Sequence, residues 1–496
     1  MAFKYVNVPE NISVEDCISN NYCLAPSKHI GFSPKPSVSF KTLDTLCKES
    51  TNKEKIKKEG TYNYTEIGNI DVSSGYVESD KCFGVNVPSD TPKQVQVGDI
   101  LISTVRTYRG GIGFVNERIE NHVCSPAIMI LRQVDGSITK EYLFAVLRTD
   151  FFIEQILGFQ NRGMYPRIEK EAMKCIYIPI PKSTDDLQYI TLLVKSYLNK
   201  LSLIKKRHKE ILSIIDVELK SNQKNNNFTY ELPKISEIEE IGRLDTARYS
   251  QRYKSYEFFI KNYRHGFFKL SDYGYKVKRG QNLQISNIGQ SYYSDVFQKG
   301  FYNLAISSNF SEYSIIDKLT YLGNKNDLKK IQKGDIVFSA RGAQFGRVIV
   351  FPESIANTIT NIDSLVIQSK QPKLSRSIFI AMFLNNLRWN KHIYSVAITG
   401  SGANSLTQYQ SDDINFPEFP DNIQEKVAKL YYNQNSIYSR RPLSPDDFLE
   451  IDNEYNKTAG IYNLDKTAKE IRNRLNDSID AIINGKNIKK EFDITS

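Results

Sequence analysis

The stretch GDILISTVRTYRGGIGFV, residues 98–115, has a near-copy later in the chain, GDIVFSARGAQFGRVIV at residues 334–350. Each copy begins with Gly-Asp, continues as a short apolar run that ends near a Ser, and then scatters arginines among glycines. A turn signal ahead of an apolar run predicts a strand–turn–strand element. The recurrence indicates that one structural unit is used twice.

Two further echoes keep the same order along the chain. IGNI at 67–70 is matched by ISNI at 285–288, and GMYPRIEKEAMKCIYIPIP at 163–181 by GANSLTQYQSDDINFPEFP at 402–420. Several ordered matches predict the duplication of a unit of about 220–240 residues, which is long enough for a domain and a connector. The arginines do not keep register, because Arg106 aligns one place away from Arg341.

A long helix is predicted between the two copies, since glycine and proline are absent from 183 to 221. It would run over 185–220, about 54 Å at ~1.5 Å per residue, and end in the polar run SNQKNNN at 221–227. An apolar seam recurs at heptad spacing and needs a partner helix. Its members are Leu187, Ile190, Val194, Tyr197, Leu201, Ile204, Ile211 and Ile215. His208 falls on this seam, where a histidine is typically a core residue.

A second, interrupted helical pattern follows Pro420 and supplies the partner. It stops at SRRPLSPDD (439–447), where two prolines disfavour a helix, and resumes near Leu464. We expect the two connectors to pack as an antiparallel pair. The predicted domains are therefore 1–182, a central spacer helix over 183–227, 228–421, and a distal helical region over 422–496 that is interrupted at about 436–463.

Each of the two units has mixed α+β character. Short β-runs are separated by Gly, Asn, Ser and Pro, and amphipathic stretches at 140–157 and 377–393 predict helices in matching places. The fold class is α+β: two similar domains separated by long helices packed as an antiparallel coiled coil, with an internal pseudo-two-fold repeat.

Composition excludes several classes of protein. The six cysteines form no CxxC pair, which argues against a zinc site and favours buried free thiols in a reducing cytosol. We see no signal peptide and no apolar segment near the ~18 residues that a membrane span needs. A net charge of +10 is compatible with nucleic acid. A cytoplasmic protein is expected.

Catalytic motifs are missing from the sequence. It has no GxxxxGK[ST] phosphate loop, no GxGxxG, no HExxH and no GxSxG. Carboxylate pairs such as Asp185-Asp186 fall at predicted helix starts, where they favour the helix dipole. We expect neither catalytic residues nor a metal site in this chain.

Basic and polar residues recur instead on glycine-rich loops. Glycine lets a backbone approach a phosphate closely, and Arg, Asn and Gln contact base edges in pairs of hydrogen bonds. For a single residue a solvated surface position is the common alternative, but the paired set favours nucleic acid. The candidate DNA-binding residues are Arg106, Tyr108, Arg109, Asn161, Arg162, Tyr165 and Arg167 in the first unit, and Lys276, Lys278, Arg279, Asn282, Arg341, Gln344, Arg347, Ser401, Asn404 and Gln408 in the second.

These features together resemble the specificity subunit of type I restriction–modification systems. The resemblance rests on the two Gly-Asp phrases, on the Gly-to-Pro-x-Pro echo that leads into a long helix, on PKSTDDLQYITLLVKSYLNKLSLIKKR after residue 180, and on the duplicated layout. It covers nearly the whole chain. The interruption at about 436–463 departs from the family pattern and puts partner docking at that end in doubt.

The resemblance implies a non-catalytic subunit that binds double-stranded DNA for phage defence. Each domain would read one part of a bipartite site, and the helices would set the gap and dock two methyltransferase subunits. Those partners would use S-adenosylmethionine, and an ATP- and Mg-dependent restriction subunit would join them where restriction accompanies methylation; the chain itself would need no cofactor. Two alternatives remain: the recognition subunit of a restriction or phage-defence system that is not ATP-driven, and an enzyme with an unrecognised active site.

Overall fold

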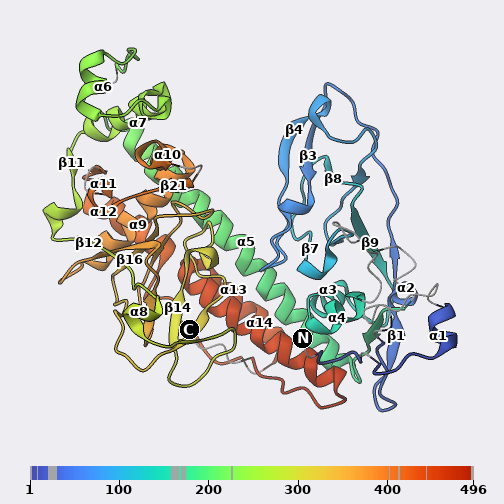
Figure 1. Ribbon diagram of the computed structural model, residues 1–496. Coiled ribbons are helices and arrows are strands. Elements are labelled where there is room, and N and C mark those ends of the chain that lie inside the picture. Colours follow the sequence, from blue (N-terminus) through green and yellow to red (C-terminus); the bar gives the residue numbers. More distant parts are fainter. Residues whose placement is uncertain are drawn as a thin grey trace. The chain divides into compact units, whose positions relative to one another are not determined.

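The computed structural model describes residues 3–7, 9–19, 29, 31–157, 167–168, 175–224, 227–400, 403–411, 414–442 and 444–492. The chain divides into two compact units, whose elements are labelled in Figure 1. Unit 1 consists of Met1–Leu203, Tyr438–Lys457 and Lys466–Ser496, and unit 2 consists of Ile204–Ile437 and Thr458–Asp465. Each unit is therefore assembled from separated stretches of sequence.

Unit 1 contains two four-stranded sheets in the described part of the chain. The first has the order β2 (Cys47–Glu49), β9 (Ile128–Val134), β6 (Ile100–Ser103), β7 (Ile112–Phe114) and is antiparallel throughout. The second has the order β4 (Asp80–Phe83), β3 (Thr61–Thr65), β8 (His122–Cys124), β5 (Lys93–Gln94), with β3 and β8 parallel. A two-stranded ribbon joins β1 (Phe40–Thr42) to β10 (Tyr177–Pro179).

Unit 2 repeats this plan. Its first sheet has the order β12 (Lys276–Arg279), β19 (Ser364–Gln368), β16 (Ile336–Ser339), β17 (Val348–Val350). Its second has the order β13 (Tyr292–Ser294), β15 (Thr320–Gly323), β14 (Tyr302–Ala305), β18 (Thr358–Thr360), with β14 and β18 parallel. Two short ribbons pair β11 (Phe267–Phe268) with β22 (Phe416–Pro417), and β20 (Ile398–Gly400) with β21 (Ala403–Ser405).

The Gly-Asp phrase opens the same strand in both units, namely β6 and β16. Gly98 and Gly334 have φ values of 82° and 88°, a left-handed conformation that favours glycine. The carboxylates of Asp99 and Asp335 each accept a hydrogen bond, 2.8 Å long, from the backbone N–H three residues earlier. The predicted internal repeat is confirmed by this shared turn and by the matching strand order.

The helices predicted at 140–157 and 377–393 form in matching places, each as two pieces. They are α3 (Lys140–Leu147) with α4 (Asp150–Leu157), and α9 (Leu374–Trp389) with α10 (His392–Val396). The Thr139 side chain caps α3 by accepting from the N–H of Tyr142. Besides the connector helices α5 (Thr184–Ser221), α13 (Pro445–Thr458) and α14 (Ile461–Ile483), the other described α-helices are α1 (Val14–Ser19), α2 (Leu43–Leu46), α6 (Ile235–Ile241), α7 (Gln251–Lys261), α8 (Ile285–Ile288), α11 (Gln408–Ser411) and α12 (Asp421–Tyr431).

The predicted connector is one continuous helix, α5 (Thr184–Ser221), of 38 residues. Its seam is apolar and packed: Ile190, Val194 and Tyr197 are buried in unit 1, and Ile204, Ile211 and Ile215 in unit 2, while Leu187 and Leu201 are half-buried. His208 is only 2% exposed, and its Nε2 lies 3.0 Å from the side-chain oxygen of Asn385. It is a core histidine, as the seam position predicted.

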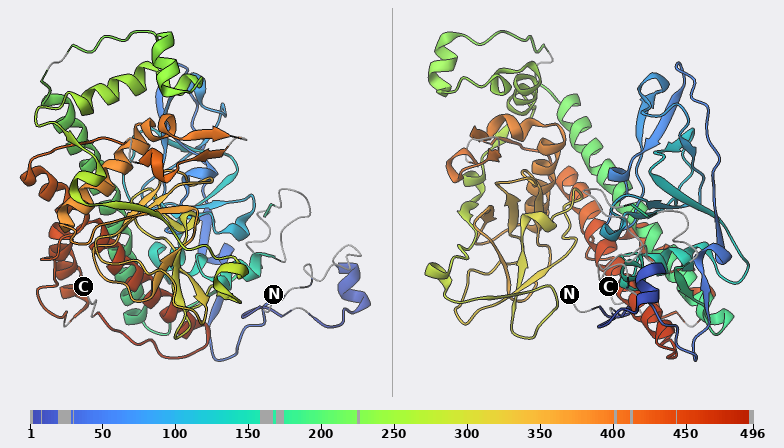
Figure 2. Two further views of the ribbon diagram at one scale, coloured as in Figure 1. Left: turned by 60° about the vertical axis from the view of Figure 1, so that its left-hand side comes forward. Right: turned by 45° about the vertical axis from the view of Figure 1, so that its right-hand side comes forward.

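Helix α14 (Ile461–Ile483) packs against the first part of α5 within unit 1. The Lys182 ammonium donates to the Gly485 carbonyl at 2.9 Å, next to the start of α5. Further along α5, Tyr197 and, on α14, Arg472 donate to the neighbouring carbonyls of Ser74 and Ser73. The two helices therefore run antiparallel, as predicted, and Figure 2 shows α14 beside α5.

The predicted interruption at about 436–463 needs correction, because helix α13 (Pro445–Thr458) lies inside it. Proline is tolerated in the first turn of a helix, where its missing N–H would have no intrahelical partner. Pro445 therefore starts α13 instead of preventing it. Residues 438–457 belong to unit 1, where α13 packs against α5 through a fully buried ion pair of 2.7 Å between Lys200 and Asp452.

Two other expectations from composition can be compared with the structure. Cys47 and Cys124 are buried free thiols, but Cys175 is exposed. The prediction of buried thiols is therefore correct for only some of the cysteines. Over the described residues, no helix combines the length and the apolar character needed to cross a membrane.

Candidate nucleic-acid interface

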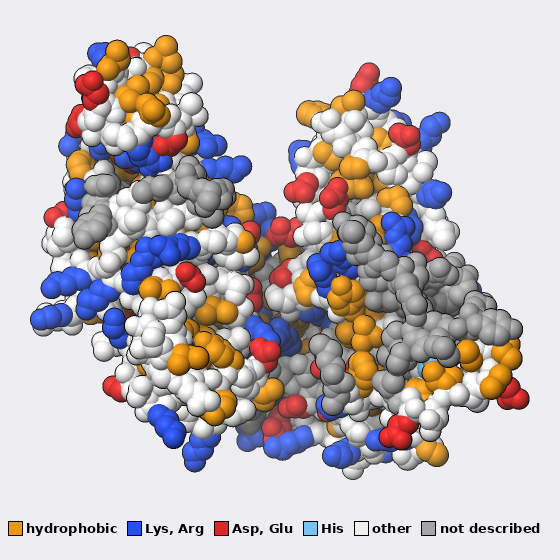
Figure 3. All heavy atoms as spheres, in the orientation of Figure 1, with side chains coloured by type: hydrophobic (Ala, Val, Ile, Leu, Met, Phe, Trp, Pro, Cys, Tyr) orange, Lys and Arg blue, Asp and Glu red, His pale blue; other side chains and the backbone are white. Residues whose placement is uncertain are grey.

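The candidate residues of unit 2 gather around edge strand β12. Lys276 and Lys278 are exposed on this strand, and Arg279 at its end is half-buried. The Gln408 amide donates to the Val277 carbonyl at 2.8 Å, which holds α11 against the strand. Figure 3 shows Lys and Arg side chains gathered on the side of unit 2 where β12 lies.

A second segment crosses the end of strand β16 beside this edge. Arg341 pairs with Ser405 as an antiparallel bridge, and the N–H of Leu406 donates to the Ala340 carbonyl at 3.0 Å. The Arg341 Nε also lies 3.3 Å from the Ser405 hydroxyl. The tertiary structure thus brings Arg341 and the β21 residue Asn404 together, although more than sixty residues separate them in sequence.

The two arginines of this cluster, Arg279 and Arg341, are close enough to repel each other. Burial lowers the pKa of Arg279, and the Arg341 guanidinium lowers that pKa further. The Arg279 guanidinium donates to the carbonyls of Ile362 and Leu406, which fixes its position near Arg341. An anion placed beside the pair would relieve this repulsion, so the site favours a phosphate or a base edge rich in acceptors.

In unit 1 the corresponding loop is η4 (Thr107–Arg109), where Tyr108 and Arg109 are exposed and Arg106 precedes the turn. The backbone of Arg106 is left-handed, with a φ of 49°. Val105 pairs with Arg167 as an antiparallel bridge, and the N–H of Ile168 donates to the Thr104 carbonyl at 2.9 Å. Arg167 is therefore brought next to Arg106.

The arrangement is the same in both units. In each unit a backbone segment from the last of the three sequence matches, 163–181 in unit 1 and 402–420 in unit 2, pairs with a residue shortly after the Gly-Asp strand. That residue is Val105 in unit 1 and Arg341 in unit 2. This equivalence accounts for the one-place shift between Arg106 and Arg341 that the sequence displays. Ser405, which the sequence did not single out, makes this contact; its position within the GANSLTQ echo is the signal that could have identified it.

Other candidates lie elsewhere. The Arg347 guanidinium donates to the Phe310 carbonyl and lies 3.7 Å from Glu312, so its charge is engaged within unit 2. The Asn282 side chain accepts from the N–H of Gln284, and Gln344 is half-buried in the loop after β16. Asn161, Arg162, Tyr165 and Ser401 lie outside the described residues.

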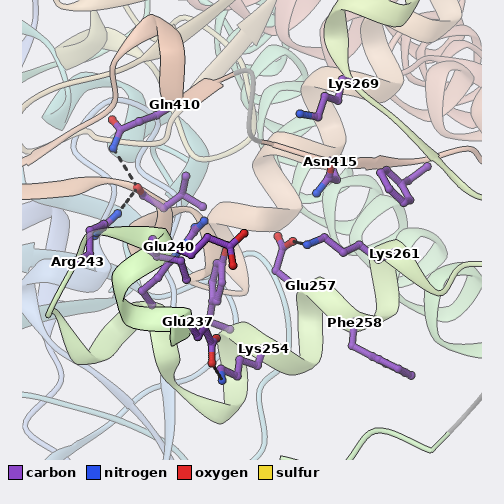
Figure 4. A pocket seen from close by; sticks show the side chains of 15 residues that line it. Glu237, Glu240, Arg243, Lys254, Glu257, Phe258, Lys261, Lys269, Gln410 and Asn415 are labelled. Atoms are coloured by element: carbon purple, nitrogen blue, oxygen red, sulfur yellow. Dashed lines mark hydrogen bonds and ion pairs between the residues drawn. The ribbon is translucent and has the colours of Figure 1, made fainter. Parts of the chain in front are cut away.

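A separate pocket of about 880 Å³ lies in unit 2 beside α6 and α7 (Figure 4). Its charged lining is mixed, and much of it is paired: Lys254 lies 2.9 Å from Glu237, and Lys261 lies 3.5 Å from Glu257. Glu240 adds a further carboxylate to the wall. Arg243, Arg248 and Lys269 also line the pocket, and Arg243 is paired with Asp245 at 2.6 Å, so much of the positive charge here is engaged within unit 2.

Comparison with solved structures finds specificity subunits at low sequence identity. The HsdS subunit from Thermoanaerobacter tengcongensis is 14% identical, with 92% of this chain and 98% of that chain covered and a TM-score of 0.32. The type I restriction-modification system S subunit from M. genitalium is 13% identical, with 92% and 97% covered and a TM-score of 0.35.

Comparison by sequence finds a further similarity. Over 100 residues the chain is 26% identical to the type I restriction enzyme HindI specificity subunit of Haemophilus influenzae, a match that spans 19% of this chain and 21% of that relative. Residues 40–213, which include most of unit 1 and much of α5, match the family described as the type I restriction modification DNA specificity domain. This part of the chain is therefore similar to that domain.

Proposed function

We propose that the chain is the DNA sequence-recognition subunit of a type I restriction–modification complex. Residues 1–182 and 228–421 would each read one part of a bipartite site, the 183–227 helix would act as the spacer, and residues 422–496 would complete the helical region. The chain would work in the cytoplasm without catalytic residues of its own. Methylation would be performed by two bound methyltransferase subunits that use S-adenosylmethionine, and cleavage by an ATP- and Mg-dependent subunit where one is present.

The observation that carries this proposal is the repeated pairing at the end of β6 and β16. In both units a scaffold strand ends in arginines that a second segment holds in place, at Val105–Arg167 and at Arg341–Ser405. The scaffold is shared, whereas the side chains on it differ. A protein that reads two different half-sites with one fold needs this combination, because phosphate contacts position the protein and base contacts specify the sequence.

The distribution of charge at the β12 edge supports the binding of DNA in particular. Exposed Lys276 and Lys278 offer charge to phosphates, while the crowded Arg279 and Arg341 gain most from an acceptor between them. Arginine contacts guanine O6 and N7 with two hydrogen bonds, which gives a base preference as well as affinity. We propose these four residues, with Asn404 and Gln408, as the DNA-facing set of unit 2, and Arg106, Tyr108, Arg109 and Arg167 as that of unit 1.

Mapping of methylated bases in a host that carries this gene and its neighbours tests the proposal. A bipartite methylated motif is expected, and replacement of residues 228–421 by the equivalent part of another specificity subunit should change one half of that motif only. If the purified chain with its methyltransferase partner prefers no duplex in a randomised library, the proposal fails.

A further inference from the structure

Unit 2 displays aromatic side chains on a strand that has no counterpart among the described strands of unit 1. In the second sheet, β15, β14 and β18 of unit 2 match β4, β3 and β8 of unit 1, and unit 2 adds β13 at the open edge. On β13, Tyr292 is 64% exposed and Tyr293 is 62% exposed. Large apolar groups kept in solvent on an added element indicate a binding role, since burial in the core does not explain them.

The two tyrosines point to opposite faces of the sheet, because successive residues of a strand alternate. Tyr293 is paired with Leu322, which is fully buried in the small core that also contains Tyr302 and Leu304. Tyr292 is paired with Gly323 and therefore lies on the other face. The strand is held by its ladder, and the following turn by the Ser294 hydroxyl, which donates to the Val296 carbonyl at 2.7 Å.

Tyr293 forms one wall of a pocket of about 340 Å³. Its other walls include Leu283, Leu304, Thr320 and Asn361. This volume lies at the lower end of the range of ~300–1,000 Å³ in which small flat ligands bind. An aromatic wall beside aliphatic side chains suits a planar, uncharged ring better than a phosphate.

One lining residue, Asn361, also carries a polar atom without a hydrogen-bond partner among the described residues. The Asn361 side-chain nitrogen donates to Asp363 at 3.0 Å, but its oxygen is buried and accepts no hydrogen bond from the described residues. Buried acceptors are nearly always satisfied, so this one calls for a donor from a ligand or solvent. An asparagine amide is the group that pairs with the hydrogen-bonding edge of a nucleobase.

The pocket is connected to the basic edge described above through the segment that follows β12. Arg279 lies four residues before Leu283 on the same segment, and its guanidinium donates to the carbonyl of Ile362, next to Asn361. Gln281 between them is bridged to Asn361, and its N–H donates to the Thr360 carbonyl at 2.8 Å. A nucleic acid whose backbone lay on Arg279 and Arg341 would therefore be close to this pocket.

From these contacts we infer that unit 2 takes one nucleobase of the bound DNA out of its stack and holds it against the Tyr293 ring, with a base edge at Asn361. This inference rests on the proposed function and adds a deformation step to recognition at one half-site. Stacking of a base on an aromatic ring contributes enough to offset part of the cost of unstacking. Unit 1 would read its half-site without such a pocket, since β13 has no counterpart among its described strands.

A double-mutant cycle tests the inference on the full chain bound to its partner subunits, with one change in the protein and one in the DNA. Each base of the unit 2 half-site, apart from the methylated one, is replaced in turn by an abasic site, and affinity is measured for the wild type, Tyr293→Ala, Tyr293→Phe and Tyr292→Ala. At one position we expect Tyr293→Ala, which should weaken binding to intact DNA about tenfold, to have no effect on DNA that carries the abasic site there, because no base remains for the ring to hold. Tyr293→Phe should behave as wild type, because the ring remains.

Tyr292→Ala is the matched control, since the neighbouring ring is equally exposed on the other face of β13. Its effect should simply multiply with that of every abasic site. Multiplicative effects of Tyr293→Ala at every position would overturn the inference while leaving the proposed function intact. Absence of specific binding by the wild type would instead remove the proposed function. If Tyr293→Ala instead weakens association with the partner subunits, and its effect does not depend on any base, the pocket is a protein contact. That result would overturn the inference as well.

Discussion

Arg106 and Gly342 occupy the same place in the two units, and both have a left-handed backbone, with φ values of 49° and 85°. Each directly follows a residue whose backbone pairs with a distant segment: Val105 pairs with Arg167 in unit 1, and Arg341 pairs with Ser405 in unit 2. Glycine adopts this conformation freely, whereas a side chain there costs roughly 1–2 kcal/mol. Unit 1 therefore keeps an arginine at a position where the backbone favours glycine, which is expected when the side chain is needed for function.

Replacement of Arg106 by glycine separates these two effects. We expect Arg106→Gly to leave unit 1 at least as stable as wild type, because relief of strain offsets the greater freedom of the unfolded chain. DNA binding should nevertheless weaken. Arg109→Gly is the control, since it removes a neighbouring guanidinium from η4 and should lower the free energy of unfolding by about 0.5–1 kcal/mol. Urea denaturation and DNA titration measure the two outcomes, and a large loss of stability in Arg106→Gly would contradict this account.

Arg341 and Arg347 lie on one loop and should behave differently. Arg341→Ala should weaken DNA binding and reduce the slope of log affinity against log salt by about 1, because one phosphate or base contact is lost. Arg347→Ala should leave that slope unchanged and lower stability instead, since its guanidinium is bound to the Phe310 carbonyl. Titrations at several salt concentrations distinguish them, and equal slopes for wild type and Arg341→Ala would remove Arg341 from the interface.

The buried ion pair between Lys200 and Asp452 should be costly to break. Both side chains are almost fully buried, and the Lys200 ammonium also donates to Asn456 at 2.7 Å. Lys200→Ala leaves a buried carboxylate without its partner, so we expect a loss of about 3–5 kcal/mol. The double change Lys200→Met with Asp452→Leu should recover much of it, because no charge then stays buried. Lys195→Met, in an exposed pair with Glu141, should change stability by less than ~1 kcal/mol.

Acid should destabilise both units through buried histidines. Burial lowers the pKa of His122 in unit 1 to about 4, and burial likewise lowers the pKa of His208 in unit 2 to about 4. Between about pH 6.5 and pH 4 the unfolded chain binds protons that the folded chain does not, so stability falls as the pH falls through this window. At pH 5 each histidine should cost about 2 kcal/mol relative to neutral pH.

The contribution of one such histidine can be isolated with His208→Gln, which keeps a group able to bond to Asn385. Its thermal unfolding should depend less on pH between 7 and 5 than that of wild type. An unchanged dependence would mean that His208 does not carry this effect. Carboxylates also titrate at low pH, so the difference between variant and wild type is the quantity to compare.

The spacer role of α5 can be tested at the point where the helix passes from unit 1 to unit 2, after Leu203. Insertion of seven residues there keeps the apolar seam in phase, because a heptad restores the same helix face. We expect the gap between the methylated half-sites to change while both half-sites stay the same. An altered half-site would show that α5 takes part in reading and does not act as a spacer.

Local patterns in the sequence determined a large part of this structure. The two Gly-Asp phrases predicted equivalent strands, because a left-handed glycine before an apolar run is a local requirement of the turn. The heptad seam and the absence of glycine and proline predicted α5 within a residue or two of its observed ends. Both signals are short-range, so neighbouring residues suffice to specify them.

Tertiary structure alone decided which distant segments meet. The pairing of Arg341 with Ser405, the engagement of Arg347 by Phe310, and the pocket between Tyr293 and Asn361 join residues far apart in sequence, and no local periodicity encodes such contacts. Helix α13 was missed for a related reason: prolines disfavour a helix locally, but burial of Phe448 and the Lys200–Asp452 pair stabilise it once α5 is in place. Local sequence patterns thus specify the repeated scaffold, because they depend on neighbouring residues only. Packing between distant segments determines which side chains are placed to contact a ligand.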